Sequence, residues 1–199
     1  MTVVRYAGMS LKCTRVTAIV LLAVGMLASC ATVPVVESAR TSMYRNVHDI
    51  QFEYPRSWKL EDMSKNYGSL AEAERAGASY IQIFSYDPLQ ASNPTDQVSA
   101  TQVKIAILLS NNPDKLDYQA VLGRIGDGLV GKSPFGINGK QALRVRYFIR
   151  SEERNEKLDI LAIEYFDQDL YARFICYPWN SSHVKEFEAV VRSFRYKGK

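Results

Sequence analysis

The stretch LDILAIEYF at residues 158–166 carries apolar side chains at nearly every position. A strand that faces water on one side alternates apolar and polar residues, so this run predicts a central strand covered on both faces. A turn at residues 167–169 separates it from a second apolar run at residues 170–177. Because a hairpin joins neighbouring strands in antiparallel fashion, the two runs predict an antiparallel sheet.

Other strands are expected on both sides of this hairpin. Residues 50–54 alternate between apolar and polar side chains, and the segment at 58–60 is expected to be a short partner strand for them. Further strands are expected at residues 80–86, 103–109 and 141–150, the last of them after the turn signal Asn138-Gly139.

Helices are expected at three places. Ser69 and Glu72 fit a capping box for a short helix that Gly77 would close. Asp117 can cap a helix with apolar residues from Tyr118 to Leu129 at helical spacing, and a last helix begins near residue 182. We therefore expect an α+β fold, a mainly antiparallel sheet sandwiched by helices, with the C-terminal helix packed on the sheet.

The first 29 residues have the layout of a signal peptide. Three basic residues precede an uncharged run at 16–27, which is followed by small residues and Cys30. A helix that crosses a bilayer needs about 20 apolar residues, so this run is short for a permanent transmembrane anchor.

The residues LASC at 27–30 resemble the lipobox of bacterial lipoproteins. That resemblance implies a lipid on the sulfur of Cys30 and cleavage just before it. The absence of aspartate at Ala31 then favours the outer membrane, with the domain facing the periplasm. An ordinary secretory signal or a short membrane anchor is the alternative. We expect residues 30–45 to be a lipidated tether and residues 46–199 a single domain.

Four segments together resemble the PsbP-like family, namely FEYPRSW at 52–58, YIQIFSYDP at 80–88, INGKQALRVRYFI at 137–149 and FEAVVRSFRY at 187–196. The resemblance implies an α/β/α sandwich without enzymatic activity that binds or assists a larger assembly. It carries over no catalytic residue, and we expect no cofactor.

Composition argues against nucleic-acid binding. Three of the 25 Lys and Arg residues lie in residues 1–29, which leaves 22 against 21 Asp and Glu in the mature chain. The basic excess therefore sits mostly in the removed peptide. Cys13 leaves with that peptide and Cys30 is expected to carry lipid, so Cys176 has no partner for a disulfide.

Residues 126–133, GDGLVGKS, fit the phosphate-loop pattern GxxxxGK[ST] through Gly126, Gly131, Lys132 and Ser133. A phosphate loop needs a strand before it and a helix starting at the Lys-Ser pair. Here a helical pattern precedes Gly126, and Pro134 follows Ser133. We interpret the match as a coincidence, place the glycines at a helix end and in a loop, and expect no nucleotide binding.

Arg144, Arg146, Phe148 and Arg150 share one face of the strand at 141–150. Arginines around an aromatic ring could receive an anionic sugar, a lipid headgroup or the carboxylates of a partner. The alternative is a solvated face with local ion pairs to residues such as Glu164.

Catalytic and metal-binding motifs are missing from the sequence. The two histidines, His48 and His183, form no metal-binding motif, and no GxSxG is present. Cys176 alternates with apolar residues and is expected to be a small buried hydrophobe, with a reactive thiol paired to His183 as the alternative.

These features favour a lipid-anchored cell-envelope protein whose domain binds a protein or small ligand without catalysis. We expect its partners to be the membrane, through lipid at Cys30, and an unidentified envelope protein or small ligand. A periplasm-facing hydrolase with an unrecognised site is the alternative.

Overall fold

The structure, a computed structural model, describes residues 41–89, 100–111, 117–151, 156–167 and 170–197. The expected signal peptide, Cys30 and the tether up to residue 40 lie outside these residues. So do residues 90–99. In the described parts of the chain, no helix is both long enough and apolar enough to cross a bilayer.

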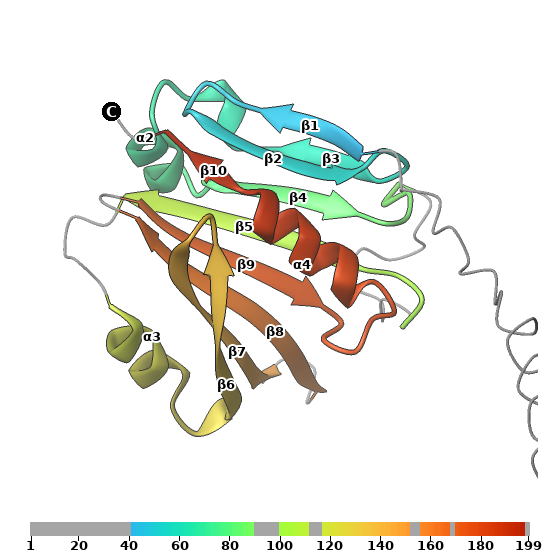
Figure 1. Cartoon of the computed structure of the whole chain (residues 1–199), viewed down its shortest axis with the longest axis vertical. Coiled ribbons are helices and arrows are strands. Elements are labelled where there is room, and N and C mark those ends of the chain that lie inside the picture. Colours follow the sequence, from blue (N-terminus) through green and yellow to red (C-terminus); the bar gives the residue numbers. More distant parts are fainter. Residues whose placement is uncertain (1–40, 90–99, 112–116, 152–155, 168–169, 198–199) are drawn as a thin grey trace, which may run out of the picture. The chain divides into compact units, whose positions relative to one another are not determined.

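The centre of the fold is a seven-stranded sheet in which every neighbouring pair is antiparallel (Figure 1). Its strands, in spatial order, are β3 (Lys59–Asp62), β4 (Tyr80–Phe84), β5 (Lys104–Asn111), β9 (Leu170–Tyr177), β8 (Glu156–Asp167), β7 (Lys140–Ser151) and β6 (Leu129–Ile137). The run LDILAIEYF lies in β8, between β7 and β9. Its apolar residues contact both layers, as the sequence predicted.

A second sheet has three strands, in the order β1 (Thr41–Arg45), β2 (Ile50–Pro55) and β10 (Arg195–Tyr196). The predicted extent of the tether, residues 30–45, is too long, because residues 41–45 form β1 and pair with β2. The ordered domain therefore begins before residue 46. The segment at 58–60 was also expected to pair with β2, but Leu60 in β3 pairs with Ile83 of β4 instead.

Two of the three expected helices begin at the predicted caps, Ser69 and Asp117. Ser69 Oγ accepts a hydrogen bond from the Glu72 amide, and Asp117 Oδ1 accepts one from the Ala120 amide. The helices are α2 (Leu70–Arg75), α3 (Tyr118–Ile125) and α4 (Val184–Ser193), with short 3-10 turns η1 (Ser64–Asn66) and η2 (Gly126–Gly128). The predicted extension of α3 to Leu129 is wrong, because Gly126 ends the helix at positive φ and Leu129 begins β6.

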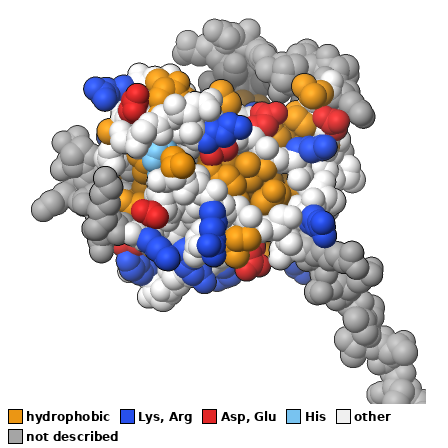
Figure 2. All heavy atoms as spheres, turned by 90° about the horizontal axis from the view of Figure 1, so that it is seen from above, with side chains coloured by type: hydrophobic (Ala, Val, Ile, Leu, Met, Phe, Trp, Pro, Cys, Tyr) orange, Lys and Arg blue, Asp and Glu red, His pale blue; other side chains and the backbone are white. Residues whose placement is uncertain are grey.

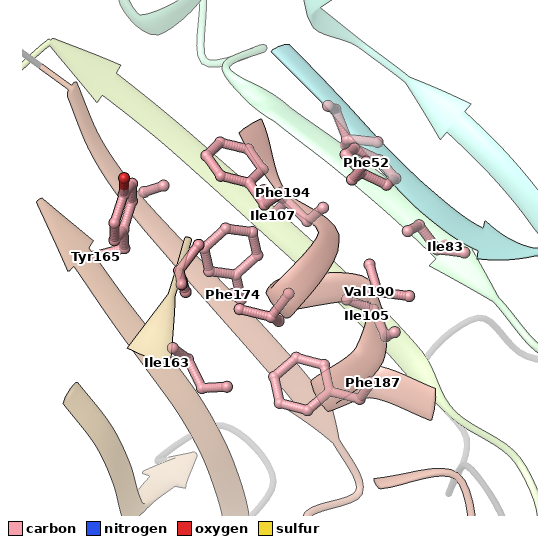
Figure 3. Packing of buried hydrophobic residues seen from close by; sticks show 14 of the residues in the cluster. Phe52, Ile83, Ile105, Ile107, Ile163, Tyr165, Phe174, Phe187, Val190 and Phe194 are labelled. Atoms are coloured by element: carbon pink, nitrogen blue, oxygen red, sulfur yellow. The ribbon is translucent and has the colours of Figure 1, made fainter. Parts of the chain in front are cut away.

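The main core lies where α4 and β2 cover one face of the seven-stranded sheet (Figure 1). Phe187 and Val190 of α4 and the following Phe194 pack against Phe174 of β9, all of them fully buried (Figure 3). Burial of apolar side chains of this size is the main stabilising contribution to the fold. The C-terminal helix is therefore packed on the sheet, as predicted.

The opposite face of the sheet has a smaller core beneath α3. Val145, Tyr147, Ile160 and Ala162 pack there with partly buried residues of α3 and β6. Helices thus cover both faces of a mainly antiparallel sheet, which confirms the predicted α+β class. The three-stranded sheet beside α4 is an addition that the sequence did not indicate.

Candidate functional site

A pocket of about 470 Å³ lies between strands β6 and β7 and the segment that joins β9 to α4. Its volume falls in the range of small-ligand sites, roughly 300–1,000 Å³. Its polar and aromatic lining residues include Ser133, Arg144, Arg146, Trp179, Asn180 and Ser181. We call this the arginine pocket.

The register of β7 places the two arginines in this pocket. Arg144 pairs with Ile163 and Arg146 with Leu161, so both point to the same face of the sheet as the main core. Ala142, two residues earlier on that face, is fully buried. The side chains of β7 therefore change from buried and apolar to charged where the main core ends.

Arg146 is held by an aromatic ring rather than by a carboxylate. Its guanidinium carbon lies 3.2 Å from the centroid of the Trp179 ring, the stacked geometry of a cation–π contact. Within the described residues, Arg146 has neither an ion pair nor a hydrogen bond, and its Nε is buried without a partner. No acidic side chain in the described parts of the chain is therefore paired with its positive charge.

Arg144 has a partner on the C-terminal helix. Its Nη2 lies 3.2 Å from Glu188 Oε1, and Arg192 approaches the other oxygen of the same carboxylate at 3.9 Å. The alternative of a solvated face named Glu164 as an example of a partner, but the local ion pair that forms is the one between Arg144 and Glu188. Glu164 pairs in register with Leu143 and points to the opposite face, where its Oε1 accepts from Arg173 Nε at 2.9 Å.

The wall that carries Trp179 is fixed by hydrogen bonds to another segment. Ser181 Oγ donates to the Gln102 carbonyl at 2.7 Å and accepts from the His183 amide at 3.1 Å. The Ser182 amide donates to the Ala100 carbonyl at 2.8 Å. The segment before α4 is thus attached at several points, and the Trp179 ring has a defined place against Arg146.

The residues of the phosphate-loop pattern have a different geometry from a phosphate loop. Gly126 ends α3, whereas Gly131, Lys132 and Ser133 lie in the edge strand β6. The expected position of Gly131 in a loop is wrong, because Gly131 pairs with Arg146 and Ser133 with Arg144. The pairing nevertheless brings this part of the pattern to the arginine pocket, so two sets of residues that seemed unrelated in sequence share one site.

Phe148 and Arg150 share the face of Arg144 and Arg146 but do not line the pocket. Lys157 lies over the Phe148 ring at 4.4 Å, and Arg150 is exposed. The predicted binding face is therefore divided, with two of its four residues at the pocket. The contact between Trp179 and Arg146 was not predicted from the sequence, since loop residues carry no periodic signal.

The alternative of a reactive cysteine has little support in the geometry. Cys176 is fully buried in the main core, and desolvation raises the pKa of its thiol to about 12. The His183 ring packs edge-on against Trp58, and its Nε2 lies 3.1 Å from the Thr101 carbonyl oxygen. Among the described residues, no group of three or more His, Cys, Asp or Glu is placed to hold a metal ion.

A second hollow, of about 690 Å³, lies between the β1–β2 turn and the β3–η1 segment, and Tyr44, Leu60 and Met63 are among its lining residues. Tyr44 donates a hydrogen bond to Asp62 across it. Figure 2 shows one face of the molecule, on which apolar side chains gather near the middle and both signs of charge surround them. Mixed charge of this kind does not single out one class of partner.

Comparison with known proteins leaves the family open. No family model and no curated protein matches the chain. Three solved structures are similar. The cyanobacterial PsbP (CyanoP) of Synechocystis has 14% sequence identity and a TM-score of 0.47, and the match covers 86% of this chain and 99% of that one. A Bacteroides thetaiotaomicron protein has 12% identity and a TM-score of 0.45, with 76% of this chain and 46% of that one covered, and a Pseudomonas aeruginosa protein of unknown function has 14% identity and a TM-score of 0.43, with 80% and 99% covered. One of the three is thus a PsbP protein. The identities and TM-scores are too low to assign the chain to a family or an activity.

Proposed function

We propose that this chain is a lipid-anchored cell-envelope protein whose domain binds a ligand or a protein partner at the arginine pocket, without catalysis. The observation that carries the proposal is Arg146, a cation in a pocket that the described residues leave without an acidic partner. Such a group is fixed in advance, so a binding partner does not have to order it.

The chemistry of the lining supports binding more than catalysis. Among the described residues that line the pocket, none has a carboxylate or an imidazole side chain. A hydrolase usually needs a nucleophile next to a general base, and both within reach of the substrate. The polar groups at this pocket are guanidinium, amide and hydroxyl groups, which recognise anions and hydrogen-bond acceptors.

The proposed anchor rests on the lipobox resemblance at residues 27–30. A diacylglyceryl group on Cys30 would hold the domain at a membrane, since each buried CH₂ contributes ~0.8 kcal/mol. The residue at Ala31 favours the outer membrane, with the domain in the periplasm. Metabolic labelling with a fatty acid tests this, because Cys30→Ala should lose the label; equal labelling of both chains would contradict it.

The binding role is tested by what purifies with the full-length chain in a non-ionic detergent. Mass spectrometry should find a molecule enriched on the wild type and on Arg150→Gln, but reduced on Arg146→Gln. Arg150 is a matched control, since it has the same charge, strand and face but lies outside the pocket. Equal enrichment on all three chains, or no enrichment, would contradict the proposed role of the pocket.

A further inference from the structure

We propose that the arginine pocket binds a phosphate monoester, either as a small soluble molecule or as the terminal phosphate of a lipid headgroup. This inference rests on the proposed binding role and names the class of ligand. The site shares three residues with the phosphate-loop pattern, but its chemistry comes from arginine side chains on a strand rather than from a glycine-rich loop before a helix.

The charge balance of the pocket favours an anion with more than one negative charge. Arg144 and Arg146 bring two guanidinium groups to it, whereas Lys132 pairs with Val145, so its side chain points to the opposite face of the sheet and adds no charge inside the pocket. Glu188 compensates Arg144 in part, since Arg192 shares the same carboxylate. A phosphate monoester carries about −1.5 to −2 charges at neutral pH, whereas a carboxylate carries one. A phosphate monoester therefore matches the excess of positive charge in the pocket more closely than a carboxylate does.

The spacing of the arginines also fits a tetrahedral oxyanion. Two residues apart on β7, their backbone positions are separated by about 6.6 Å along the strand. Two planar guanidinium groups that start from such positions can donate to different oxygens of one phosphate, each in fork geometry. The contact with Trp179 already restrains one of them, which reduces the entropy that binding would cost.

The opposite wall can complete the shell of donors. Asn180 brings a side-chain amide to it and Ser133 brings a hydroxyl group from β6, whereas the hydroxyl group of Ser181 already donates to the Gln102 carbonyl. The first backbone amides of α4 are not available to a ligand, because those of His183 and Val184 already donate hydrogen bonds to Ser181. Leu161 and Val184 give the pocket an apolar part. A compact phosphate with a short carbon body, rather than a bare ion, would fill both parts.

The chain provides its own fluorescent reporter for this site. It has two tryptophans, Trp58 and Trp179, so a Trp58→Phe background leaves Trp179 as the reporter in the pocket wall. We would titrate the full-length chain in non-ionic detergent with sn-glycerol 3-phosphate and follow the emission of Trp179. A saturable change is the expected result, and inorganic phosphate should produce a weaker one.

Two arginine variants test whether the response comes from the pocket. Loss of a hydrogen-bonded charge costs about 1.5–3 kcal/mol, so Arg146→Gln should raise the apparent Kd about tenfold or more. Arg150→Gln should leave the Kd within about twofold. Circular dichroism of each variant confirms that it is folded, and Arg146→Lys, which keeps the charge but not the fork, should fall between the two.

Two further titrations identify the source of the phosphate. Mixed micelles with phosphatidic acid present a monoester on a lipid, and micelles with phosphatidylglycerol present a diester. A response to phosphatidic acid above that to glycerol 3-phosphate identifies a headgroup site, and the reverse identifies a soluble ligand. Either result supports the proposal, provided that it depends on Arg146.

Three results would overturn the inference. They are no response to any phosphate at millimolar concentration, an equal response to acetate, or equal affinity of Arg146→Gln and wild type. If a co-purified molecule still depends on Arg146 while phosphate does not bind, the proposed function stands and the phosphate assignment falls. If neither depends on Arg146, both fall.

Discussion

Arg146 on strand β7 stacks on Trp179, with 3.2 Å between its guanidinium carbon and the centroid of the ring. The contact joins the middle of one strand to the segment that leads into α4, which is far away in sequence. It places a cation at the wall of a pocket without an acidic partner among the described residues. The same contact therefore holds the pocket wall together and keeps a positive charge at the pocket.

This stack should be measurable as a coupling energy. In a double-mutant cycle of Arg146→Gln and Trp179→Leu, we expect a coupling of about 0.5–2 kcal/mol in the free energy of unfolding, because a partly desolvated cation–π contact contributes that much. Chemical denaturation of the four chains provides the value. The same cycle with Arg150→Gln in place of Arg146→Gln should give a coupling near zero, and equal couplings would argue against the stack.

Gly128 should tolerate no side chain. A Cβ built there would lie 2.5 Å from the Phe148 carbonyl oxygen, a backbone atom that cannot move aside. We expect Gly128→Ala to lower the free energy of unfolding by about 1–3 kcal/mol through this overpacking. Gly123, inside α3, has open space at its Cβ position.

Gly123→Ala is therefore the matched control, and it should raise the free energy of unfolding by about 0.5–1 kcal/mol. Thermal and urea denaturation measure both changes. Similar effects of the two substitutions would show that the approach of η2 to β7 is wrong.

The buried Glu164 should depend on its arginine. Glu164 is fully buried and accepts hydrogen bonds from Arg173 Nε and Tyr171 Oη. Arg173→Ala would leave a buried carboxylate without its cation, and we expect a loss of about 3 kcal/mol in the free energy of unfolding. The double variant Arg173→Met with Glu164→Leu should recover most of this loss, since apolar side chains can replace a buried ion pair. If the single variant is as stable as wild type, the network contributes nothing.

The buried thiol of Cys176 should lower the free energy of unfolding at alkaline pH. Burial raises the pKa of its thiol to about 12, above the value of about 8.5 in an unfolded chain. The folded state therefore keeps a proton that the unfolded state loses, so stability falls as pH rises from about 9 to 12, by up to ~1.4 kcal/mol per pH unit. Cys176→Ala should show a shallower decline in urea denaturation over this range. An unchanged slope would contradict the buried thiol.

Local sequence signals predicted many of the elements because these depend on nearby residues. The caps at Ser69 and Asp117 act within four residues, and the turn at Asn138-Gly139 needs the positive φ that both residues adopt. The apolar run at 158–166 also indicated its own place in the centre of the sheet, because a strand that is buried on both faces shows no alternation of apolar and polar residues. These signals were sufficient for the α+β class.

The errors arise where pairing between distant segments decides the structure. Residues 41–45 have little local preference, yet they form β1 because β2 offers a free edge. Gly131, Lys132 and Ser133 become a strand through their bonds to β7. The pocket itself needs β6, β7 and the segment around Trp179 to meet, and no local pattern shows that meeting.

The central claim, that the arginine pocket is where this protein binds its ligand or partner, is tested most directly by crosslinking in living cells. A photoreactive amino acid at Ser133 would lie in the pocket, whereas one at the exposed Val130 on the same strand would lie outside it. We expect capture of a specific molecule from position 133, lost when Arg146→Gln is added, and none from position 130. Equal capture from both positions, or capture that does not depend on Arg146, would contradict the account.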